Sequence, residues 1–218
     1  MSAIKVVIHS FPLLLQAAMT TFVLSLVATA IGLVIAALVC ALGLSKRRWL
    51  ARAGAVYVSF FRGVPLLVQL LLIYYFLPFI GIDVPSLVAA VVGLSLCTAA
   101  YLAEILRGGL ASIPPGQREA GEMLGLAKSQ IWRRLLLPQA VRSMLPAIVS
   151  EVTLLLKASS LISVIGVAEL TRTGQNIAAS TYQPLEIYAT VGAIYLALNL
   201  LLAAGGGMME RRFGLARR

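Results

Sequence analysis

The sequence has few charged residues for its length and almost none of the residues that build metal or disulfide sites. Only 12% of its 218 residues are charged, against about 25% in a typical soluble domain. The single histidine, His9, excludes a histidine-based metal site, and Cys40 and Cys97 lie inside apolar stretches and imply no disulfide framework. The chain lacks a G-x-x-x-x-G-K-[ST] pattern, which excludes a P-loop of its own. We therefore expect no bound metal or cofactor.

Apolar residues dominate instead. They make up 60% of the chain, and the mean hydropathy is +0.95, which indicates an integral membrane protein. The formal net charge of +10 is also compatible with a nucleic-acid-binding protein, but such proteins spread their basic residues over a polar surface. Here the basic residues lie in a few clusters between long uncharged runs. We interpret these clusters as membrane topology and expect no nucleic acid partner.

The uncharged runs are long enough for several membrane-spanning helices, each of which needs about 20 apolar residues. The first run, 10–45, is too long for the core of a cleaved signal peptide. The pattern predicts an all-α membrane protein with one transmembrane domain over residues 1–218. Its five helices are expected at about 14–44, 56–80, 85–107, 141–166 and 185–208. A short amphipathic helix at 167–180 is expected to lie on the outer membrane surface.

The distribution of basic residues predicts the orientation of these five helices, because Lys and Arg concentrate in cytoplasmic loops. Of the 18 basic residues, 15 share one face if the first loop, the loop at 114–138 and the C-terminus are cytoplasmic. Only Lys5 and Arg172 are then outside, and Lys157 lies within the membrane. We therefore expect the N-terminus outside and the C-terminus in the cytoplasm.

The loop at 114–138 is the longest charged segment, and its pattern predicts two short helices. The first is expected at 117–124, with Gly125 supplying the left-handed residue that ends it. Ser129 is expected to cap the second helix, and Pro138 to disturb it before the fourth span begins. Two short helices joined at a glycine would form a rigid protrusion able to dock into a groove on a partner.

Within this loop, the stretch EAGEMLGLAKSQIWRRLLLPQA resembles the "EAA" motif of ABC importer permeases. The motif reads E-A-A, then Gly four residues after the second Ala, then I-x-L-P. The chain matches it at five positions: Glu119, Ala120, Gly125, Leu137 and Pro138. Gly121 replaces the second Ala and Leu135 replaces the Ile; both replacements are apolar.

The resemblance extends over about residues 10–213 and points to the polar amino acid permeases of the histidine, glutamine and cystine type. Segments 59–78, 99–120 and 154–170 are similar to their patterns. One departure is clear: family members usually read K-D-T-S-L where residues 157–161 of this chain read K-A-S-S-L. The resemblance also implies five transmembrane helices, the number that the apolar runs indicate independently.

The resemblance implies a multi-subunit importer in the bacterial inner membrane. Two ABC ATPase subunits would dock on the cytoplasmic face, and a second permease, either a copy of this chain or a paralogue, would pair with it. A periplasmic or lipid-anchored binding protein would deliver the amino acid. The residues expected to couple the chain to the ATPase are Glu119, Ala120, Gly121, Gly125, Leu137 and Pro138, with Glu119 meeting the ATPase and Gly125 forming the turn.

Ionisable residues at membrane depth are costly and are therefore functional candidates. Glu104 and Arg107 can pair on one helix face, and Arg62 is expected to reach the membrane interface or the partner subunit. Glu151 either faces the substrate, where it would suit an ammonium or guanidinium group, or forms a salt bridge to a neighbouring helix. Lys157, six residues along the chain from Glu151, is expected to bond carbonyls or an acid across the dimer.

Two uncharged polar residues, Gln69 and Thr98, complete the candidate substrate pathway, with interhelical hydrogen bonds as their alternative role. Two other functions remain open. A stand-alone carrier would usually show internal repeats, and none is evident here. A permease for another small solute is disfavoured only by the family resemblance.

Overall fold

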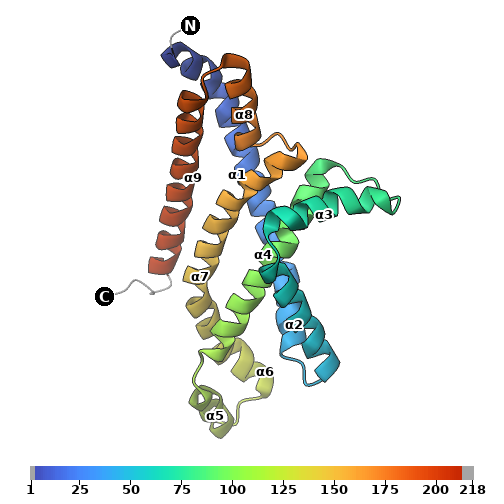
Figure 1. Cartoon of the computed structure of the whole chain (residues 1–218). Helices are drawn as coiled ribbons and strands as arrows, with labels where there is room; N and C mark the ends of the chain where they lie inside the picture. The colour runs from blue at the N-terminus through green and yellow to red at the C-terminus, as the bar shows by residue number, and fades with distance from the viewer. Residues whose placement is uncertain (1–2, 213–218) are drawn as a thin grey trace.

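The computed structural model describes residues 3–212, and every regular element among them is helical. Four long helices form the frame: α1 (Ala3–Gly43), α4 (Ser86–Ala111), α7 (Leu137–Ala158) and α9 (Pro184–Arg212). In Figure 1, α1, α7 and α9 run alongside one another, and α4 crosses in front of α1. Shorter elements connect them: α2 (Arg48–Gly63), α3 (Leu66–Phe79), α5 (Pro115–Met123), α6 (Lys128–Gln130) and α8 (Leu170–Thr181). The predicted all-α membrane fold is confirmed.

The second predicted span, 56–80, is wrong as a single helix. In its place α2 and α3 meet at a bend of 105°, so that the structure holds four candidate spans, or five if the bent pair counts as one. Pro65 causes the break: it lacks a backbone N–H and disfavours helical backbone in the preceding residue. Val64 accordingly adopts extended dihedrals, φ −96° and ψ 134°.

Gln69 stabilises this break. Its side-chain amide donates hydrogen bonds to the backbone carbonyls of Phe61, at 2.9 Å, and Val64, at 2.7 Å. Carbonyls at a helix C-terminus have no partner within the helix, so the amide satisfies groups that the bend exposes. Gln69 is buried, and these bonds are of the kind expected under the alternative to lining the pathway, interhelical hydrogen bonding.

The remaining helix boundaries also differ from those expected. The expected boundaries were placed at charged residues, but such residues mark only the edge of the hydrocarbon layer, and a helix can continue past them. The helix expected at 14–44 begins at Ala3, and those expected at 85–107 and 185–208 extend to Ala111 and Arg212. The helix expected at 141–166 is α7 followed by a 3₁₀ segment, Ser159–Ile165. The hydroxyls of Ser159 and Ser160 donate to carbonyls three residues back, which favours this tighter winding.

The centre of the molecule is the close crossing of α1 and α4. A Cβ added to Gly32 would lie 2.4 Å from Thr98 Cγ2 and 3.1 Å from the Ser95 carbonyl oxygen. Small residues allow helices to approach this closely in a membrane. Leu24 and Ala28 of α1 are buried here against Leu94, so α4 is held from one side by α1 along much of its length.

The helix expected at 167–180 is α8, and it is anchored more firmly than a helix resting on a membrane surface. Leu170 and Ile177 are buried against α1 and α9. Glu169, immediately before α8, is fully buried. Its carboxylate accepts hydrogen bonds from the Thr171 and Arg172 N–H groups, at 2.9 and 2.7 Å, and from the Tyr195 hydroxyl of α9, at 2.9 Å.

Sequence analysis assigned no role to Glu169, although an acid directly before a helix is a recognisable N-cap. Glu169 lies beyond the third continuous span, which ends at Ile165. Its carboxylate contacts Thr21 of α1 and Tyr195 of α9, so it lies where α1, α8 and α9 meet. Burial raises the pKa of the Glu169 carboxyl, and the hydrogen bonds from the Thr171 and Arg172 N–H groups oppose that rise. The carboxylate thus joins α8 to α9 without a cation.

We expect Glu169→Ala to destabilise the chain by about 1–3 kcal/mol, because it leaves several buried donors without an acceptor. Tyr195→Phe removes one donor and should cost roughly 1 kcal/mol. Thermal unfolding of the detergent-solubilised protein measures both. Asp83→Ala, at an exposed acid, is the matched control and should leave the melting temperature unchanged. A Glu169→Ala variant as stable as the control would contradict this role.

Candidate coupling surface and pathway residues

A polar protrusion, formed by residues 115–136, extends from the end of the helical frame. It consists of α5, α6 and a π-helical turn, Ile131–Leu136, that leads directly into α7. In Figure 1 it lies at the lower end, beyond α4 and α7. The structure brings together all six predicted coupling residues: three on α5, Gly125 in the following turn, and Leu137 and Pro138 at the start of α7.

The local sequence explains where α5 begins and ends. Pro115 occupies the first turn, where a missing N–H costs nothing. Arg118 and Glu122, one turn apart, form an ion pair at 2.9 Å on the outer face. Gly125 has φ +70°, and Leu126 N–H donates to the Gly121 carbonyl at 3.1 Å, which is the hydrogen bond of a Schellman C-cap. The predicted left-handed glycine at position 125 is confirmed.

The second short helix differs from the prediction at its start. Ser129 does not cap it; the backbone N–H of Ala127 instead donates to the Gln130 side-chain oxygen at 3.0 Å. At its end the helix is disturbed before the proline, as expected, because the chain widens into the π-turn directly before Pro138. That wider turn accommodates the missing N–H and the bulk of the ring. Gln139 then donates to the Leu135 carbonyl at 2.8 Å, so the protrusion and α7 are one continuous helical path.

Gly121 is a packing residue and not a surface contact. It is buried, and a Cβ added to it would lie 2.9 Å from Ile131 Cγ1 and 3.1 Å from Leu135 Cδ1. This close approach seats α5 on the π-turn. A second tie is the hydrogen bond from Gln139 Nε2 to Gln117 Oε1, at 3.3 Å. The protrusion is therefore fixed to α7 through side chains as well as through the chain itself.

The outer surface of the protrusion is unusually apolar at its tip. Met123 is 90% exposed and Leu124 is 76% exposed, beside the exposed Glu119 and Ala120. Gly121 is the residue of α5 that lies against the π-helical turn. Met123 and Leu124 therefore point outward. Two adjacent exposed apolar side chains on a polar loop are compatible with a protein–protein contact.

The five candidate pathway residues are not gathered in one place. Glu151 and Thr98 are together: the Thr98 hydroxyl of α4 donates to Glu151 Oε1 of α7 at 3.0 Å. Gln69 lies at the α2–α3 break, as described above. Lys157 is exposed on α7. Within residues 3–212 neither Glu151 nor Lys157 forms an ion pair, so the salt-bridge alternative for Glu151 is not realised in this chain.

Glu104, the fifth candidate, lies in a separate ionic group. Arg107 donates to both of its carboxylate oxygens, at 2.9 and 2.6 Å, which is the pairing expected from their spacing. Arg62 of α2 approaches the same carboxylate at 3.8 Å and lies 5.3 Å from the centre of the Tyr101 ring. No cluster of three His, Cys, Asp or Glu side chains suited to a metal occurs in the described part of the chain.

Comparisons with known proteins agree with this architecture. Relatives include the glutamine transport system permease protein GlnP of Escherichia coli K12, which is 40% identical over 206 residues, 93% of this chain and 94% of the relative. The arginine transport system permease protein ArtQ of Bacillus subtilis is 37% identical over 206 residues, 94% of each chain. The octopine transport system permease protein OccM of Rhizobium meliloti is 40% identical over 199 residues, 86% of this chain and 80% of the relative.

Solved structures give the same result. A chain of an amino acid ABC transporter with histidines superposes with a TM-score of 0.89 at 35% identity, covering 94% of this chain and 96% of that one. An inward-facing MetNI methionine ABC transporter superposes with a TM-score of 0.79 at 25% identity, covering 93% and 97%. The family model for the binding-protein-dependent transport system inner membrane component matches residues 33–214. The chain therefore belongs to this family, whose members are inner-membrane permease subunits of ABC importers.

Proposed function

We propose that this chain forms part of the translocation pathway for a polar amino acid and is driven through the 115–136 protrusion by a separate ABC ATPase. The observation that carries the proposal is the pairing of a rigid protrusion, apolar at its tip, with an amino acid permease fold. The orientation follows from charge: with the N-terminus outside and the C-terminus in the cytoplasm, 15 of 18 basic residues lie on the side of the protrusion.

The tip of α5 is the proposed ATPase contact. Glu119 supplies a charge, and Met123 and Leu124 supply apolar area to fill a groove. Two ATPase subunits would bind the protrusions of two paired permeases. The other residues have a supporting role and do not contact the ATPase themselves. They fix the position of α5, the turn after it and the junction with α7: Gly121, Gly125, Leu137 and Pro138. Movement of the ATPases would then be transmitted to α7 and the residues that it carries.

The proposed substrate contact is Glu151, with Thr98 as its partner. The carboxylate is partly buried at membrane depth and bonded only to a neutral hydroxyl, which leaves its charge available to an ammonium or guanidinium group. An amino acid moving past α7 would present such a group. Relatives that transport glutamine, arginine and octopine fit a path for polar amino acids, although they do not select one among them.

The proposed assembly has a second permease, either a copy of this chain or a paralogue, and an external amino-acid-binding protein. Lys157 supports the pairing, because an ammonium group exposed on a spanning helix needs a partner that residues 3–212 do not supply. A carbonyl or an acid of the second subunit would meet this need. The binding protein would deliver its amino acid at the end formed by α8.

A permease for another small solute is the remaining alternative, since the family model itself names no substrate. Uptake of a radiolabelled polar amino acid into cells that express the complete transporter separates the two functions. Competition by unlabelled amino acids supports the proposal, and insensitivity to all of them contradicts it. A stand-alone carrier would be purified without a P-loop ATPase.

Reversing the charge at the tip should uncouple the transporter. We expect Glu119→Lys to reduce substrate-stimulated ATPase activity and uptake by roughly a hundredfold, because a misplaced charge at a protein interface costs several kcal/mol. Asp83→Lys, an exposed acid remote from the protrusion, is the control for added charge. If Glu119→Lys retains the stimulation and uptake of the control, Glu119 has no role in coupling.

Neutralising Glu151 should alter transport without disturbing the ATPase contact. We expect Glu151→Gln to reduce uptake of a cationic amino acid by about tenfold, the effect of losing one charge-assisted hydrogen bond. Uptake of a neutral amino acid, where the transporter accepts one, should fall much less. Thr98→Val removes the partner hydroxyl but keeps the charge and is the matched comparison. Equal losses for cationic and neutral amino acids would make Glu151 a structural residue.

A further inference from the structure

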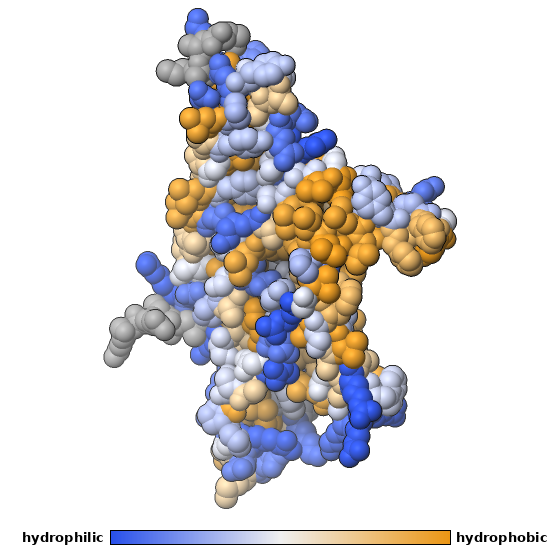
Figure 2. Space-filling model, viewed as in Figure 1, coloured by the Kyte–Doolittle hydropathy of each residue, from blue (hydrophilic) through white to orange (hydrophobic). Residues whose placement is uncertain are grey.

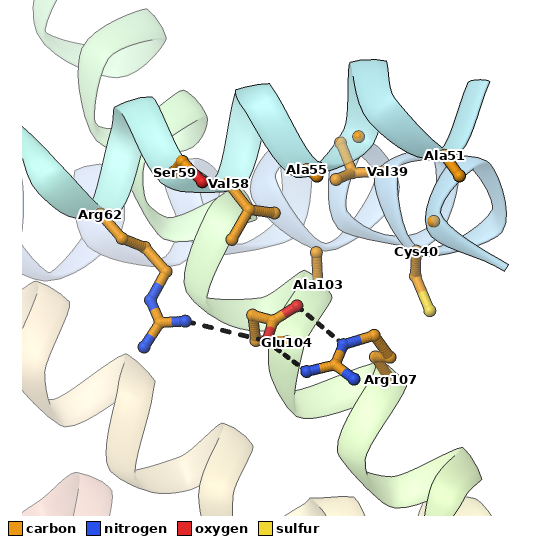
Figure 3. Close-up of a pocket in the computed structure, with 12 residues that line it drawn as sticks. Val39, Cys40, Ala51, Ala55, Val58, Ser59, Arg62, Ala103, Glu104 and Arg107 are labelled. Carbon is orange, nitrogen blue, oxygen red and sulfur yellow. Dashed lines mark hydrogen bonds and ion pairs between the residues drawn. The ribbon is translucent and has the colours of Figure 1, made fainter. Parts of the chain in front are cut away.

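A cavity of about 410 Å³ lies between α1, α2 and α4, outside the protrusion, and neither Glu151 nor Thr98 lines it. Figure 3 shows its two kinds of wall. One wall carries three charged side chains, Arg62, Glu104 and Arg107. The other is apolar and is formed mainly by Val39, Ala51, Ala55, Val58 and Ala103. The cavity is therefore amphipathic, with its charged groups gathered at one side.

The charges in this cavity do not balance. Arg107 occupies both oxygens of Glu104 at hydrogen-bonding distance, which satisfies that carboxylate. Arg62 reaches the same carboxylate only at 3.8 Å, too long for a hydrogen bond. The cavity lining therefore contains two guanidinium groups and one carboxylate, which gives it one net positive charge. No hydrogen bond from the Arg62 guanidinium is found among the described residues; it lies over the Tyr101 ring and also interacts electrostatically with Glu151 of α7.

The surroundings of the cavity indicate a lipid environment. Trp49, Val56 and Phe60 of α2 are exposed by 65%, 68% and 47%, and Figure 2 shows hydrophobic residues around the middle of the molecule with hydrophilic ones gathered at its lower end. The beginning of α2 and the turn before it carry four exposed basic residues: Lys46, Arg47, Arg48 and Arg52. Tryptophan beside a basic cluster is typical of a helix at the membrane–water interface.

We propose that this cavity binds the headgroup of an anionic phospholipid, with the phosphate accepting hydrogen bonds from Arg62. A guanidinium with free donors is well suited to phosphate. The bidentate Glu104–Arg107 pair stays intact, and the phosphate replaces only the long Arg62–Glu104 contact. The apolar wall then accommodates the first carbons of the lipid. The site lies at the face that the proposed orientation assigns to the cytoplasmic leaflet, where anionic lipids attract basic residues.

Native mass spectrometry of the delipidated full-length chain tests the site. The probe is palmitoyl-oleoyl phosphatidylglycerol, compared with phosphatidylcholine of the same acyl chains and with water-soluble glycerol 1-phosphate. We expect phosphatidylglycerol to bind more tightly than either. Arg62→Gln should weaken its binding about fivefold, the effect of one basic residue at a lipid surface. Arg62→Lys should retain part of the affinity, because it keeps the charge.

Arg211→Gln is the control, since it removes a basic residue from the far end of α9 on the same proposed face; it should leave binding unchanged. The melting temperature of each variant shows that it is folded. A photoactivatable phosphatidylglycerol should crosslink to α1, α2 or α4 in the wild-type chain and less in Arg62→Gln.

Several results would overturn the proposal. Equal binding of phosphatidylglycerol to Arg62→Gln and wild type would remove Arg62 from the site. Equal affinity for phosphatidylcholine would show that the charge is irrelevant, and equal affinity for glycerol 1-phosphate would make it a site for free phosphate esters. Loss of the crosslink on pairing with a second permease would make the cavity a subunit interface. None of these results bears on uptake or on ATPase stimulation, so the proposed function is tested separately.

Discussion

The contact of Gly121 with Ile131 and Leu135 is the constraint on which the coupling account depends. Because residue 121 has no side chain, α5 lies directly against the π-turn. The same register turns Met123 and Leu124 outward. A larger side chain would lift α5 away and change both the stiffness of the protrusion and the residues that it presents. One close approach thus sets the shape of the surface and its connection to the rest of the chain.

From this contact a single helical path leads into the membrane. The π-turn allows the chain to continue past Pro138 into α7, and α7 carries Glu151. Glu151 is in turn bonded to Thr98 of α4, which packs closely on Gly32 of α1. The α2–α3 break, stabilised by Gln69, also packs on α4, where Leu70 lies against Gly93. A displacement at the tip of α5 would therefore reach α4 and its neighbours through contacts between rigid helices, which is how ATPase closure would reorganise the pathway.

The sequence predicted the helical class, the positions of the apolar segments and Gly125, because these depend on local composition and on one backbone requirement. It predicted Ser129 as a cap wrongly, since the Gln130 side chain accepts the Ala127 N–H instead. It predicted that Pro138 disturbs the helix, but not that the disturbance is a π-turn. Pro65 was a visible signal for the bent α2–α3 pair, but the apolar run around it favoured one helix. The environment of Glu169 depends on residues as distant in sequence as Tyr195, which no local pattern reports.

The most direct test of the account is a distance measurement by electron spin resonance between spin labels at the exposed positions 118, on α5, and 150, on α7, of one permease in the assembled transporter. The account predicts that this distance stays the same with and without ATP, while the distance between the two protrusions of the paired permeases shortens. A change of the distance within one permease on ATP binding would show that the protrusion hinges on α7, and would contradict transmission through a rigid helical path.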